Sequence, residues 1–101
     1  MSSQDWLSRH DPAPPAELAN AMRTAVGEGK EQPTANDLLE SAERLLDKVL
    51  RTDCETRASA LDLLTVDALM THALQLANED PKLREEFPDE AMNRIATVRQ
   101  P

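Results

Sequence analysis

Aromatic side chains are almost absent from this 101-residue sequence, which has one Trp, one Phe and no Tyr. Because aromatic residues bury the most area each, a core with so few of them must be built from Leu, Ala, Val, Met and Ile. A chain of this length forms one domain at most, and such a domain buries only about 60–70% of the surface that its unfolded form exposes. We therefore expect a thin core made by helices that pack side by side.

Cysteine is scarce as well. Cys54 is the only cysteine, which excludes an intrachain disulfide and a cysteine-rich metal site, and favours a reducing compartment. Residues 1–5 lack the basic and apolar runs of a signal peptide, and no stretch of the chain approaches the roughly 18 apolar residues of a membrane span. We expect a cytoplasmic protein without a membrane segment.

Positive charge is under-represented, because 11 Lys and Arg stand against 19 Asp and Glu and leave a formal net charge of −8. This charge repels phosphate backbones and anionic lipid headgroups, so direct nucleic-acid binding is disfavoured. An acidic surface keeps a small protein soluble, and it can also occupy a basic site on a partner. Composition alone leaves both interpretations open.

The clearest positive signal is an amphipathic helix over residues 34–51. Its start, Thr34-Ala35-Asn36-Asp37, is typical of a capping box. Apolar residues then recur at helical spacing, and charged residues fill the opposite face. The apolar face consists of Leu38, Leu39, Ala42, Leu45, Leu46, Val49 and Leu50. Other helices of this chain, a second copy or a different partner must cover it.

The segment 53–78 is predicted to form the next helix. A second capping-box pattern, Thr52-Asp53-Cys54-Glu55, marks its start. The segment is apolar on more than one face, which indicates a central position or two interfaces. The β-branched pair Thr65-Val66 predicts a kink or break near Thr65. The predicted fold is an all-α bundle of four to five helices, with 34–51 and 53–78 as a central antiparallel hairpin.

The N-terminal part divides at a stiff segment, Asp11-Pro-Ala-Pro-Pro15, which cannot be helical through its middle. We predict an extended or partly helical arm over residues 1–15 and a single helical domain over residues 16–101. The arm carries Trp6 and Leu7, whose burial is worth several kcal/mol at roughly 25 cal/mol per Å². We therefore expect the arm to dock somewhere, so that Trp6 serves either folding or the capture of a partner.

Proline and glycine mark the remaining helix boundaries. A helix that begins near Pro15 should end at Gly27, where the two glycines of the chain lie together. Asp80-Pro81 predicts a capped short turn that ends at Glu86. Phe87-Pro88 then predicts the start of a separate last helix, whose apolar residues are Met92, Ile95, Ala96 and Val98.

Residues able to carry chemistry are few. The histidines, His10 and His72, lie far from Cys54 and from each other, which does not suit a helical metal site. Cys54 is placed at a predicted helix start, which favours a reactive thiolate, but its acidic neighbours oppose this and no histidine partner is evident. The sequence therefore predicts no metal, no cofactor and no catalytic constellation.

Two hypotheses of function follow. The first is a non-enzymatic protein–protein interaction module, such as a small adaptor, regulator or chaperone-like protein, that acts through its apolar helix face as a homodimer or with a partner helix. The second is an acidic antagonist, such as an antitoxin, an immunity protein or an anion mimic, that masks a basic site on a partner. An enzyme that uses Cys54 or His72 is disfavoured. The candidate interface residues are Trp6, Leu7, Leu38, Leu39, Leu45, Leu46, Val49 and Leu50.

Overall fold

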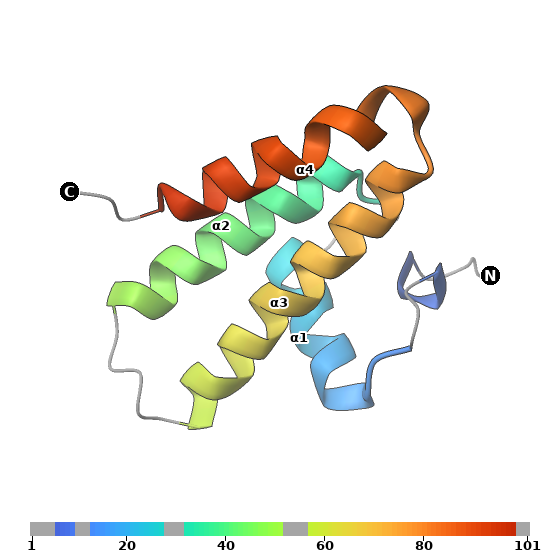
Figure 1. Ribbon diagram of the computed structural model, residues 1–101. Helices are drawn as coiled ribbons and strands as arrows, with labels where there is room; N and C mark the ends of the chain where they lie inside the picture. Colours follow the sequence, from blue (N-terminus) through green and yellow to red (C-terminus); the bar gives the residue numbers. More distant parts are fainter. Residues whose placement is uncertain (1–5, 10–12, 28–31, 52–56, 99–101) are drawn as a thin grey trace.

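The fold was analysed in a computed structural model, in which residues 6–9, 13–27, 32–51 and 57–98 are described. Figure 1 shows that this part of the chain forms helices and connecting turns and contains no strand. The all-α prediction is thereby confirmed with four α-helices, while a fifth is not, since the additional element is a short 3₁₀ helix. The elements are η1 (Trp6–Arg9), α1 (Ala16–Val26), α2 (Ala35–Arg51), α3 (Arg57–Asn78) and α4 (Pro81–Ala96).

The predicted capping box at the start of α2 is confirmed. Thr34 Oγ1 accepts a hydrogen bond from the backbone N–H of Asp37 at 3.0 Å, and Asp37 Oδ2 accepts one from the backbone N–H of Thr34 at 3.0 Å. The two residues thus satisfy each other's donors where the helix itself offers no acceptor. The second predicted capping box, Thr52-Asp53-Cys54-Glu55, lies outside the described residues.

Glycine and proline end and begin helices as the sequence predicts. Gly27 follows α1 with φ of 96°, and its N–H donates to the carbonyl of Arg23 at 2.9 Å. This left-handed conformation favours a residue without Cβ. The side chain of Asp80 caps α4 by accepting from the backbone N–H of Lys82 at 2.9 Å, and Pro81 occupies the first helical position.

The third helix is continuous where the sequence favours an interruption. α3 runs from Arg57 to Asn78 through Thr65, so the expected break is not there, and a kink is not confirmed. Thr65 is fully buried, and its Oγ1 donates to the carbonyl of Leu61 at 2.7 Å. Because a carbonyl one turn earlier in the same helix satisfies this hydroxyl, Thr65 needs no position at a helix start.

The prediction of a short turn followed by a new helix at Phe87 is wrong, because α4 is one helix with Pro88 inside it. Proline removes one backbone hydrogen bond from the helix and crowds the preceding turn. Burial offsets this cost: Leu83, Phe87 and Ala91 are spaced four residues apart and pack on one core.

The continuous helix also decides which residues of α4 reach the core. Phe87 and Ala91 are buried, and Ile95 packs partly against the core. Met92, which the sequence places among the apolar residues of the last helix, is 63% exposed. One residue along an α-helix turns the side chain by about 100°, so Met92 points away when Ala91 points inward.

The centre of the bundle is the contact between α2 and α3, the most extensive contact between any two described helices. α3 also contacts α1 and α4 (Figure 1), which confirms the central position that its apolar faces predict. The antiparallel geometry of the pair stays a prediction. Fully buried residues at the centre include Leu38, Leu39 and Ala42 of α2, and Leu69, Ala73 and Ala77 of α3. The alanines allow a close approach between helices.

The N-terminal head docks on the bundle, which decides between the two roles left open for Trp6 in favour of folding. Trp6 is 6% exposed and Leu7 is 4% exposed, and both belong to the same core as the α-helices. The ring of Trp6 lies against that of buried His72, with 5.4 Å between centroids and 37° between planes. Gln75 Oε1 lies 3.3 Å from His72 Nδ1. The division into an arm and a domain stays a prediction, although η1 shares the core of the rest.

Replacing the buried indole tests this docking. We expect Trp6→Ala to lower the free energy of unfolding by about 3 kcal/mol, because it leaves a cavity beside His72. Urea unfolding followed by circular dichroism measures the change. Met92→Ala is the matched control, because 63% of this residue is exposed and its truncation should change stability by less than about 0.5 kcal/mol. Equal effects of the two variants would contradict the docked head.

Candidate functional site

The apolar face that the sequence offers as an interface is covered by the chain's own elements. Leu50 alone among the eight candidate residues is largely exposed, at 46%. Leu45 and Leu46 pack partly against the core. The other five are buried: Trp6, Leu7, Leu38, Leu39 and Val49. A partner would therefore reach most of this face only if the bundle opened.

A different helix presents apolar side chains to solvent. Leu63 and Leu64 of α3 are 45% and 53% exposed. They belong to a stripe at helical spacing, which we call the outer face of α3, and Asp67 is its single charged residue. The outer face of α3 consists of the exposed residues Ala60, Leu63, Leu64, Asp67 and Thr71.

The outward surfaces of the neighbouring helices are mostly charged. The exposed residues of α2 include Glu40, Arg44, Lys48 and Arg51, and those of α4 include Glu85, Glu86, Asp89 and Glu90. Charged outward faces are the ordinary result for helices that cover a core. α2 and α4 each expose one large apolar residue, Leu50 at 46% and Met92 at 63%, whereas α3 exposes the adjacent pair Leu63 and Leu64.

A groove lies along one side of the outer face of α3, where the segment before α1 crosses it. Its volume is about 240 Å³, and we call it the proline groove. Pro14, Pro15 and Leu18 form one wall, and Leu64 and Ala68 lie on the α3 side. The remaining lining residues are Ala13, Asp67 and Thr71. The groove combines apolar walls with one carboxylate.

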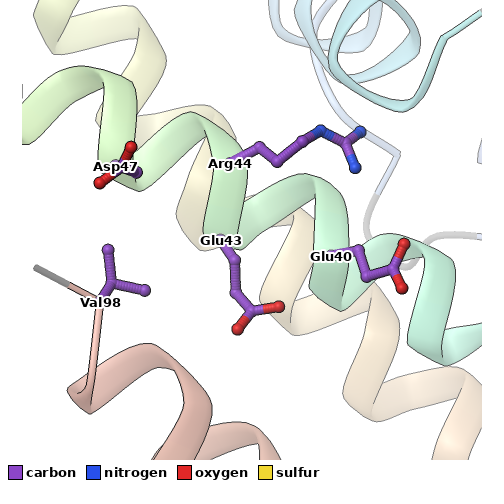
Figure 2. Close-up of a pocket in the computed structure, with 5 residues that line it drawn as sticks. All are labelled: Glu40, Glu43, Arg44, Asp47 and Val98. Atoms are coloured by element: carbon purple, nitrogen blue, oxygen red, sulfur yellow. The ribbon is translucent and has the colours of Figure 1, made fainter.

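A larger and shallower hollow lies on the charged face of α2, beside the end of α4 (Figure 2). It measures about 440 Å³ and is lined by Glu40, Glu43, Arg44, Asp47 and Val98. Figure 2 shows that Glu43 and Arg44 leave α2 in different directions. Arg44 Nη2 donates to the carbonyl of Ala25 in α1 at 3.4 Å, and Asp47 accepts from Arg51 Nε at 2.8 Å. The first contact joins α2 to α1, whereas the second lies within α2.

The strongest of these polar contacts joins α4 to α2. Arg94 Nε donates to Glu43 Oε2 at 3.2 Å, its Nη2 donates to Glu43 Oε1, and its Nη1 donates to Asn36 Oδ1 at 2.8 Å. The hydrogen bonds that Arg94 donates to Glu43 are the largest cause that raises the pKa of Arg94, and desolvation by burial opposes them. Because 51 residues separate Arg94 from Glu43, local spacing in the sequence could not reveal the pair.

No known protein family, curated protein or solved structure matches this chain. The site must therefore be judged on its own geometry.

Of the two histidines and the cysteine that could serve in catalysis, His72 alone lies in the described part of the chain. His72 is 1% exposed and packs against Trp6. Cys54 and His10 lie outside the described residues. Within the described ranges, no three His, Cys, Asp or Glu side chains gather as a metal would require. A helix with the length and apolar character of a membrane span is also not found among the described residues.

The pair between Arg94 and Glu43 can be tested against an exposed pair of the same helix. We expect Glu43→Gln to lower the free energy of unfolding by about 1–2 kcal/mol, because two charge-assisted hydrogen bonds weaken where each partner is only about a quarter exposed. Asp47→Asn removes the exposed pair with Arg51 and should cost about 0.3 kcal/mol. Urea denaturation measures both, and a larger loss in Asp47→Asn would be inconsistent with this anchoring contact.

Proposed function

We propose that this chain is a non-enzymatic helical protein–protein interaction module that acts through an exposed apolar helix face. The observation that carries the proposal is the exposure of Leu63 and Leu64 on α3, while the leucines of α2 are mostly buried. Exposed apolar stripes on an otherwise charged helical surface are a common means of protein recognition. The proposal moves the working surface from α2 to the outer face of α3.

The bundle that supports this surface has a core that does not include the two exposed leucines. The fully buried leucines of α2 and Leu69 of α3 form the core without help from Leu63 or Leu64. The proposal includes the antiparallel hairpin of residues 34–51 and 53–78, since such a pair would hold α3 rigidly along its length. It also includes a cytoplasmic location, because a single cysteine suits a reducing compartment.

The homodimer expected from the sequence remains one arrangement of this proposal. A second copy would contact the outer face of α3, because the leucine face of α2 is occupied inside each monomer. Sedimentation at tens of micromolar would detect such a dimer.

The second proposed function is an acidic antagonist that masks a basic site. The observation that favours it is the row of exposed acids Glu85, Glu86 and Asp89 on α4. Within the described part of the chain, no base lies within ion-pair distance of these three carboxylates. Binding through them would weaken steeply with salt, whereas binding through the leucines of α3 would weaken little.

Site-specific cross-linking tests the main proposal. A photoreactive residue is placed at position 64 on the outer face of α3, and a matched one at position 92, where Met92 is also exposed but lies on α4. After irradiation in extracts of the source cell, we expect discrete protein adducts from position 64 and few from position 92. Adducts of equal strength at both positions, or none at position 64, would refute the outer face of α3 as the contact surface.

A further inference from the structure

The proline groove is too small for a typical small-molecule ligand. Its volume is about 240 Å³, whereas ligand pockets run from about 300 to 1,000 Å³. A space of this size accommodates one or two side chains of a partner protein. The exposed leucines that continue from it supply the surrounding contact area.

The walls of the groove are stiff before anything binds. Pro14 and Pro15 have fixed φ angles, and Pro15 directly precedes α1. The opposite side is a turn of continuous helix that carries Leu64 and Ala68. The small side chain of Ala68 next to larger Leu64 leaves space along α3. Because these walls need little ordering, a docked side chain loses little of its binding free energy to rearrangement.

The charged side chains described at or next to the groove are acidic. Asp67 lines it, and Glu17, in the first turn of α1, is exposed close by in the chain. Among the described side chains of residues 13–18 and of the outer face of α3, none is basic. Lys48 of α2 reaches α3 at Asp62 instead, with 3.9 Å between Nζ and Oδ2. The apolar groove therefore has acidic surroundings, in a chain whose net charge is −8.

These features point away from a second copy as the occupant. Two copies that met on this face would bring their Asp67 carboxylates into one interface, between chains that each carry a net charge of −8. Like charges opposed across an interface disfavour association. A partner whose apolar residues are flanked by Lys and Arg would pack its apolar residues on the leucines and pair its basic residues with the carboxylates.

The length of the surface suits a helix. From Ala60 to Thr71 the outer face of α3 extends about 16 Å along the helix axis, which equals three turns. An amphipathic helix that lies on it can offer apolar residues at i, i+3 or i+4, and i+7 to this stripe. The same spacing leaves its basic residues at the edges of the contact.

We propose that the outer face of α3 and the proline groove together bind a cationic amphipathic helix. One apolar side chain of the partner enters the groove beside Leu64, and its Lys or Arg side chains face Asp67 and Glu17. This inference rests on the proposed interaction module and adds the chemistry of the partner.

Binding of two synthetic helices tests the proposal. One labelled peptide of about 18 residues has Leu on one face and Lys on the other, and its counterpart has Glu in place of every Lys. Fluorescence anisotropy is measured at about 50 mM and about 300 mM NaCl, which separates screened charge contacts from apolar ones. We expect the Leu/Lys peptide to bind at both salt concentrations and the Leu/Glu peptide to bind at neither.

Single substitutions test whether the peptide binds at the outer face of α3. Leu64→Ser should weaken the Leu/Lys peptide about tenfold, since it removes a leucine from the contact. Asp67→Asn should weaken it about threefold at low salt and flatten its salt dependence. Met92→Ser and Glu86→Gln, which alter an exposed apolar residue and an exposed acid of α4, should leave the affinity within about twofold. Circular dichroism checks that each variant is folded.

The outcomes separate this inference from the proposed function. Equal weakening by Leu64→Ser and Glu86→Gln, or loss of all binding at the higher salt, would overturn the inference and favour the acidic antagonist. A dimer that Leu64→Ser abolishes, with no peptide binding, would identify a second copy as the occupant; the inference would fail and the interaction module would stand. Absence of cross-linking at position 64 would refute the proposed interaction module as well.

Discussion

The packing of α2 against α3 is the contact on which the remaining structure depends. Leu38, Leu39 and Ala42 of α2 and Leu69 and Ala73 of α3 are completely buried. The other elements attach to this pair: α1 and α4 each contact both helices, and η1 adds Trp6 and Leu7 to the same core. With one Trp and one Phe in the chain, aliphatic packing between closely spaced helices supplies most of the stabilising burial.

The central position of α3 explains why its outer face is unusual. This helix contacts α1, α2 and α4, so apolar side chains occupy much of its circumference. Its buried residues also include polar ones, and these have partners: Thr65 bonds within the helix, and His72 lies against Trp6 and Gln75. Leu63 and Leu64 remain about half exposed in the folded chain, and they are not among the residues that pack on the core.

The attachment of α4 combines two kinds of interaction. Phe87 and Ala91 bury an apolar side against the core, and Arg94 bridges to Glu43 and Asn36 of α2. The first contact accounts for the helix that continues through Pro88, and the second determines how α4 lies along α2. Together they place the acids of α4 outward, while Leu63 and Leu64 of α3 remain about half exposed.

The sequence by itself determined the local features of this protein. The capping box at Thr34, the stop at Gly27 and the cap at Asp80 involve residues at most four positions apart, so their chemistry is readable along the chain. The tertiary structure alone decided which apolar face stays open, whether α4 continues through Pro88, and that Arg94 meets Glu43. These outcomes depend on burial between segments far apart in the chain, and hydrophobic spacing shows that a face must be covered without showing what covers it.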